Sequence, residues 1–195
     1  MVSTYPDKIK ADKKFRYLNP YHYVNMPLDK ESRFIFSVEN FLPEKELLSL
    51  QQTLLNLDYQ HLNRQDGTNI HYGFGCKVHP DEVQDGAFIK RIKETFHPDQ
   101  DLKIHECRAH IRYNHNEPLP HCDNDKYGFL LYVKGEPLLN NGTGFYNDNG
   151  ELYHHIGFVE NTALFFNAAK ILHTNMQSFG DSSPRYCINV FYDIE

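Results

Sequence analysis

The sequence contains no tryptophan and no unbroken run of about 18 apolar residues, the length that a transmembrane helix needs. Residues 1–14 also lack the apolar segment of a signal peptide. The four cysteines are dispersed and form no C-x-x-C pair, so neither a zinc knuckle nor a thioredoxin-type motif is indicated. We therefore expect a cytoplasmic protein with free thiols.

Positive charge is scarce as well. The chain has 20 Lys and Arg against 26 Asp and Glu, a net charge of -6. A general nucleic-acid-binding protein usually carries a basic face, and the lysines near the start of this chain are interrupted by acids. We expect neither nucleic acid nor a membrane as a partner, and the sequence leaves the oligomeric state open.

The length of 195 residues predicts one domain, because it suffices to bury a sizeable core and no repeat or low-complexity region divides the chain. Within residues 1–195, residues 1–33 read as an irregular leader. Residues 34–100 read as helical support with substrate loops, and residues 101–195 as the core of strands.

Two helices are predicted, both in the first half of the chain. The first begins after Asn40, where a capping residue, a proline and early acids occur together, and six leucines between residues 47 and 57 form its apolar stripe. The second covers residues 87–96. Between them, residues 58–86 are polar and contain glycine and histidine, which is typical of hairpins and loops that contact substrate.

From residue 98 onward the pattern changes to strands separated by turns. The predicted strands cover residues 102–113, 127–133, 143–146, 151–158, 162–166 and 186–192, and an earlier one covers residues 34–38. Residues 147–150, Asn-Asp-Asn-Gly, are a strong hairpin signal. Helices followed by many short strands indicate an α+β fold with an antiparallel double sheet or jelly roll.

The motif His121-Cys122-Asp123 points to a metal site. In an extended strand, residues two apart face the same side, so an imidazole and a carboxylate converge. These are two of the three ligands of a 2-His-1-carboxylate triad, which leaves positions on iron(II) open. Taken alone, the triplet is weak evidence and favours a surface turn, because a chain with 12 histidines contains such a triplet by chance.

Two downstream residues strengthen this hypothesis. His173 follows an apolar stretch and is placed to complete a triad with His121 and Asp123. Arg185 opens the last predicted strand, where a guanidinium can pair with a carboxylate of a co-substrate in bidentate fashion. A donor set without thiolate suits iron(II) better than structural zinc.

Together these motifs resemble a known family. The pattern comprises His121-x-Asp123, Tyr132-Val133-Lys134, Gly142-Thr143-Gly144-Phe145, Ala163-Leu164-Phe165-Phe166-Asn167, His173 and the run from Arg185 to Tyr192. It resembles the iron(II)/2-oxoglutarate-dependent dioxygenases, and most of all their prolyl 4-hydroxylase-like branch. The resemblance covers about residues 104–193, with a weaker match at residues 40–43.

The resemblance implies a double-stranded β-helix (jelly roll) with iron(II) held by His121, Asp123 and His173. It further implies that Arg185 and Tyr132 bind the distal carboxylate of 2-oxoglutarate, and that Tyr113 and Asn189 face the same co-substrate. No catalytic residue beyond the metal ligands is implied. The cofactors would be iron(II), 2-oxoglutarate and O₂, with ascorbate admitted as an auxiliary reductant.

The implied reaction is hydroxylation of an unactivated C–H bond, and retention of Asp123 favours it over halogenation. The substrate expected from the branch is a prolyl or other amino-acid side chain in a peptide or protein, with residues 58–86 long enough to form a lid. A free amino acid or small metabolite is the alternative.

Several readings of individual residues compete with these. Arg185 could be a surface residue at a strand end, and Tyr132 a core tyrosine. A cupin-like protein could use the same three ligands without 2-oxoglutarate, although it would not need a cation at the depth of Arg185. A second metal site at His105, His110 and His115 is not favoured, because spacings of five place neighbours on opposite strand faces. Phe145, Phe165, Phe166 and Phe191 are candidates for the cavity wall as well as for the core.

Overall fold

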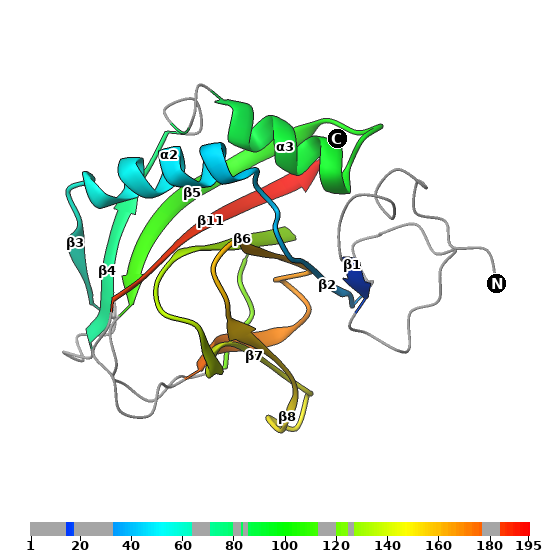
Figure 1. Ribbon diagram of the computed structural model, residues 1–195. Helices are drawn as coiled ribbons and strands as arrows, with labels where there is room; N and C mark the ends of the chain where they lie inside the picture. Colours follow the sequence, from blue (N-terminus) through cyan, green and yellow to red (C-terminus); the bar gives the residue numbers. More distant parts are fainter. Residues whose placement is uncertain are drawn as a thin grey trace.

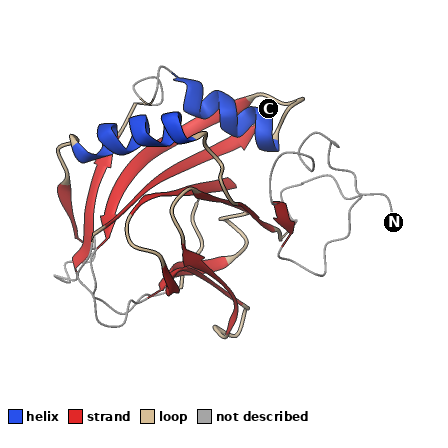
Figure 2. Cartoon of the chain, viewed as in Figure 1, coloured by secondary structure: helices blue, strands red, loops and turns tan. Residues whose placement is uncertain are grey.

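The computed structural model describes residues 15–17, 33–63, 71–79, 83, 86–112, 120–124, 127–176 and 184–195. In this part of the chain, two helices and two antiparallel sheets are present (Figures 1 and 2). The larger sheet has eight strands in the order β1-β2-β9-β6-β11-β5-β4-β3, and the smaller has three in the order β10-β7-β8.

The strands of the larger sheet are β1 (Phe15–Tyr17), β2 (Ile35–Val38), β3 (Gln60–Asn63), β4 (His71–Lys77), β5 (Leu102–Arg112), β6 (Tyr127–Lys134), β9 (Thr162–Phe166) and β11 (Arg185–Ile194). Those of the smaller sheet are β7 (Leu138–Tyr146), β8 (Leu152–Phe158) and β10 (Leu172–Met176).

This arrangement confirms the predicted α+β fold of the jelly-roll type. Every described strand pair is antiparallel. The smaller sheet packs under the larger one, and the described strands do not close into a barrel (Figure 2).

The two faces of the larger sheet have different roles, because side chains alternate along each strand. One face packs against the helices and forms the main core, which includes Ala109, Phe129, Leu131 and Val190. The opposite face contributes Leu130, Tyr132, Leu164, Phe166 and Cys187 to a second core shared with the smaller sheet. The side chains on this second face therefore point toward the space between the two sheets, where the site lies.

Helix α2 (Glu44–Leu55) confirms the first predicted helix. It follows Pro43 and carries Glu44 and Glu46 in its first turn, where acids stabilise the helix dipole. Leu47, Leu50 and Leu54 are buried against the larger sheet. The helix ends at Leu55, two residues before the end of the leucine stripe.

Helix α3 (Ala87–Phe96) has the predicted bounds and lies on the same face of the sheet as α2 (Figure 1). It starts after Gly86, whose φ of 75° is in the left-handed region that favours glycine. Neither described helix combines the length and apolar character needed to cross a membrane.

Residues 58–86 contribute β3 and β4, a hairpin as predicted, which extends the larger sheet beside β5; the rest of the expected lid includes residues outside those described. Two elements differ from the sequence-based expectation. The segment predicted as an irregular leader contains β1, which pairs with β2. His173 lies inside a strand, β10, that was not predicted. Both strands are held by pairing with distant segments, which local patterns do not reveal.

Candidate metal and co-substrate site

The segment carrying His121 and Asp123 runs beside β10. The His121 N–H donates to the carbonyl of His173 at 3.1 Å, and the His173 N–H donates back to the carbonyl of His121 at 2.9 Å. The Asp123 N–H donates to the carbonyl of Ala168 at 2.9 Å. His121 thus forms an isolated bridge with His173, and the triplet is not part of the regular strand that the sequence analysis assumed. The side chains of His121 and Asp123 nevertheless converge.

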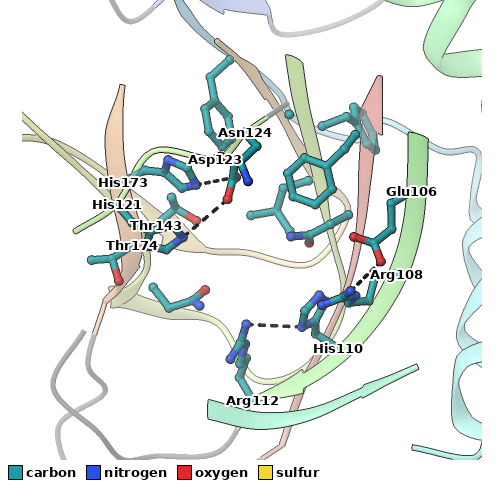
Figure 3. Close-up of a pocket in the computed structure, with 17 residues that line it drawn as sticks. Glu106, Arg108, His110, Arg112, His121, Asp123, Asn124, Thr143, His173 and Thr174 are labelled. Atoms are coloured by element: carbon teal, nitrogen blue, oxygen red, sulfur yellow. Dashed lines mark hydrogen bonds and ion pairs between the residues drawn. The ribbon is translucent and has the colours of Figure 1, made fainter. Parts of the chain in front are cut away.

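The three side chains converge on one point. Their ligand atoms lie within 4.8 Å of one another, and they form the one such cluster of His, Cys, Asp or Glu within the described residues. His173 Nε2 is 3.2 Å from Asp123 Oδ2, and His121 Nε2 is 3.7 Å from Asp123 Oδ1 (Figure 3). Adjacent ligands of an octahedral ion with bonds of about 2.1 Å are about 3 Å apart, so this spacing fits a metal ion.

A hydrogen bond fixes the ring of His173. Its Nδ1 lies 2.9 Å from the carbonyl of Ile171 and therefore carries the proton. In the neutral ring, Nε2 then presents its lone pair to the carboxylate of Asp123. Two electron-rich atoms at 3.2 Å need a cation or a proton between them, so the donor set fits a bound metal ion.

A cavity of about 380 Å³ opens beside the three side chains. Figure 3 shows two opposed walls: His121, Asp123, Asn124, Thr143, His173 and Thr174 on one side, and Glu106, Arg108, His110 and Arg112 of β5 on the other. Phe166 and Phe191 also line it, as expected for the cavity wall. Phe145 and Phe165 do not line it and belong to the two cores, which corrects that expectation.

Arg185 and Tyr132 lie together behind Thr143. The Tyr132 hydroxyl is 2.8 Å from Thr143 Oγ1, and the Arg185 guanidinium carbon is 5.6 Å from the centre of the Phe158 ring, which also packs on Tyr132. Arg185 is 6% exposed, so it is not the surface residue of the alternative reading. Neither Arg185 nor Tyr132 is among the described residues that line the cavity, whereas Thr143, which contacts the Tyr132 hydroxyl, is.

Burial governs the charge state of this pair. It raises the pKa of Tyr132, against the opposing effects of Thr143 and Arg185, so the phenol stays protonated. Burial also lowers the pKa of Arg185, although a guanidinium remains charged throughout the physiological range. The pair therefore presents a buried cation and a neutral hydroxyl.

Two glycines flank Thr143 and permit close packing there. A Cβ on Gly142, whose φ is +124°, would lie 2.1 Å from the carbonyl oxygen of Ile156. A Cβ on Gly144 would lie 2.5 Å from the sulfur of Met176 in β10. The glycines of the Gly-Thr-Gly motif thus let β7 approach both of its neighbours.

Asn189 and Tyr113 are the two remaining candidate residues for the co-substrate site. Asn189 lies on the cavity face of β11, four residues after Arg185, and its buried Oδ1 has no hydrogen-bond partner. That it faces the co-substrate stays a prediction. Tyr113 lies outside the described residues.

Sequence reasoning missed the wall formed by β5. Glu106, Arg108, His110 and Arg112 alternate with the core residues Cys107, Ala109 and Ile111, so the four polar side chains share the cavity face. From the sequence, His110 is considered only as a ligand of a second metal site. The alternation of polar and apolar residues along 106–112 was the available signal.

The comparisons with known proteins concern the fold. The sequence matches no family model and no curated protein. Among solved structures, the chain is similar to SnoN, a non-heme α-ketoglutarate-dependent epimerase of nogalamycin biosynthesis, with 14% identity, a TM-score of 0.61 and coverage of 82% of this chain and 77% of that one. It is also similar to a prolyl hydroxylase from Trichoplax adhaerens, at 14% identity, TM-score 0.61 and coverage of 81% and 82%.

A third neighbour is HygX from Streptomyces hygroscopicus, crystallised with nickel and 2-oxoglutarate, at 11% identity, TM-score 0.61 and coverage of 81% and 82%. At such identities the likeness establishes the fold. The chain therefore has the fold of the 2OG-Fe(II) oxygenases, as the sequence motifs predicted, and it carries a His-Asp-His cluster within that fold.

Proposed function

We propose that the protein is an iron(II)- and 2-oxoglutarate-dependent dioxygenase that hydroxylates an unactivated C–H bond. The observation that carries this proposal is the convergence of two imidazole nitrogens and a carboxylate within 4.8 Å, in a fold shared with such oxygenases. When bound, iron(II) with 2-oxoglutarate and O₂ would supply oxidative decarboxylation to succinate and CO₂, coupled to hydroxylation.

The residues of this chain have separate roles in the proposal. His121, Asp123 and His173 hold the metal from one side and leave positions open for co-substrate and O₂. Arg185 binds the distal carboxylate of 2-oxoglutarate, assisted by the hydroxyl of Tyr132, because a planar guanidinium matches a carboxylate in bidentate geometry. Asn189 offers its unpartnered Oδ1 to a donor at the cavity wall. Phe166 and Phe191 limit the access of water.

The substrate proposed first is a prolyl or other amino-acid side chain in a peptide or protein, with a free amino acid or small metabolite as the alternative. One structural neighbour is a prolyl hydroxylase in complex with a peptide, whereas another is an epimerase of antibiotic biosynthesis. The fold therefore accommodates acceptors of both kinds.

The test is a survey of 2-oxoglutarate turnover. Succinate is followed with iron(II), O₂ and a panel of proline-containing peptides, free proline and small metabolites, with Asp123→Ala as the matched inactive variant. We expect substrate-stimulated succinate together with a product heavier by one oxygen atom. Metal-dependent conversion of a substrate without consumption of 2-oxoglutarate would instead identify a cupin-like protein.

A further inference from the structure

The polar wall of β5 has no role in the function proposed so far. Glu106, Arg108, His110 and Arg112 line the same cavity as the triad, from the opposite side (Figure 3). A wall across from a metal centre is where the acceptor molecule must lie. The chemistry of this wall therefore bears on what the acceptor is.

The charges of the wall are unequal. Arg108 Nη2 lies 2.5 Å from Glu106 Oε1, and Lys77 Nζ lies 3.1 Å from the same carboxylate oxygen. Arg112 adds a further guanidinium to the cavity lining. Lys77 does not line the cavity, so the wall itself has two guanidiniums and one carboxylate and carries a net positive charge.

His110 orients Arg112. Its Nδ1 lies 3.3 Å from Arg112 Nη2, and because a guanidinium donates without accepting, Nδ1 must be the acceptor. Burial, with smaller effects from Arg112 and Arg108, holds the pKa of His110 well below its ordinary value, so the ring stays neutral and keeps this acceptor. His110 is thus a positioning residue for Arg112.

The register places Arg112 directly opposite Arg185. The two are partners across the β11–β5 ladder, as are Asn189 and Arg108 two steps along the same face. This register brings two guanidinium groups to the same region of the sheet. Two neighbouring guanidiniums are suited to two carboxylates, one from the co-substrate and one from a second molecule.

We propose that Arg112, held by His110 and flanked by Arg108, binds a carboxylate of the acceptor substrate while Arg185 binds 2-oxoglutarate. The acceptor is therefore a molecule with a free carboxylate, such as a free amino acid or the C-terminal residue of a peptide. A planar guanidinium matches a carboxylate in bidentate geometry. A cavity of about 380 Å³ is within the range of small-molecule sites. This inference rests on the proposed function, because it names the acceptor of that same site.

The test compares acids with their amides. Protein loaded with manganese(II) and saturated with 2-oxoglutarate, without oxygen, is titrated with N-acetylproline and N-acetylleucine, each as acid and as amide, and with the peptide acetyl-Gly-Gly-Pro in free and amidated forms. Affinity is read from the paramagnetic relaxation of the acetyl protons. Binding of 2-oxoglutarate is measured first in the same sample, by calorimetry.

We expect at least one acid to bind tenfold or more tightly than its amide. Arg112→Gln should remove this difference and leave the affinity for 2-oxoglutarate within twofold, while Arg112→Lys retains part of it. Arg91→Gln, which breaks an ion pair with Glu46 on the helical side, is the matched control and should change nothing. The peptide pair shows whether the carboxylate comes from a free amino acid or from a C-terminus.

Equal binding of every acid and its amide would overturn the proposal. So would an Arg112→Gln variant that loses 2-oxoglutarate in proportion to the acid, because Arg112 would then belong to the co-substrate site. If the wild type fails to bind 2-oxoglutarate at all, the proposed function fails, and the acid–amide comparison made without 2-oxoglutarate still decides whether Arg112 binds a carboxylate.

Discussion

His173 shows how single residues define the proposed iron site, because its ring is fixed by Ile171 on one side and faces Asp123 on the other. We expect His121→Ala, Asp123→Ala and His173→Ala each to abolish tight iron(II) binding while the far-ultraviolet circular dichroism stays unchanged. The matched control is His105→Ala, whose ring pairs with Asp193 at the far end of β5. Full iron occupancy in any triad variant would remove that residue from the site.

Arg185 is the residue on which co-substrate binding is expected to depend. Arg185→Leu should weaken 2-oxoglutarate binding by about 2–5 kcal/mol, the cost of truncating one partner of a buried charge pair. Iron binding should survive, because Arg185 is not one of the three residues whose ligand atoms converge. Calorimetric titration of the iron-loaded variant measures both, and an unchanged affinity would place the carboxylate anchor elsewhere.

His110 makes a pH-dependent contribution to stability. Because burial and the two arginines hold its pKa well below 6.5, the unfolded chain binds a proton below that pH that the folded protein does not. The contribution is complete above pH 6.5 and is lost as the pH falls, by up to about 1.4 kcal/mol per pH unit. The free energy of unfolding should therefore fall less between pH 7 and pH 5 in His110→Gln than in the wild type. Parallel profiles would contradict this.

Residue spacing was sufficient to predict the cluster of His121, Asp123 and His173 but not the opposite wall of the cavity. The H-x-D triplet, His173 and Arg185 could be found because each motif is short and its chemistry is specific. Arg108 and Arg112 carry no such signature. Their placement in a cavity depends on which face of β5 turns toward the smaller sheet.

At the scale of elements, the helices were predicted closely and some strands were not. Helix α3 has the predicted bounds because its apolar periodicity and flanking residues are local signals. Strands β1 and β10 are defined by ladders to distant segments, β1 with β2 and β10 with β7. Such pairings cannot be read from a short window of sequence.

Helix α2 offers a matched pair of leucines for testing its packing. Leu54 is 1% exposed against the larger sheet, whereas Leu48 is 56% exposed. Leu54→Ala should lower the free energy of unfolding by about 2–5 kcal/mol, and Leu48→Ala by about 0.5 kcal/mol or less. Denaturant titration measures both. Similar losses would mean that α2 does not pack as described.

For the whole molecule, the larger sheet separates stability from chemistry. Its helical side holds the main aromatic and aliphatic core, and its other side supplies both the second core and the cavity wall. The sequence predicted this class of fold from the succession of helices and strands. It could not predict that the two sheets remain open in the described residues, because closure depends on how distant strands meet.

The most direct test of the proposed function is an anaerobic titration with iron(II) and 2-oxoglutarate, followed by visible spectroscopy. We expect a weak charge-transfer band that requires both additions, persists in His105→Ala and is absent in Asp123→Ala. Absence of the band in the wild type, with iron bound, would contradict the account.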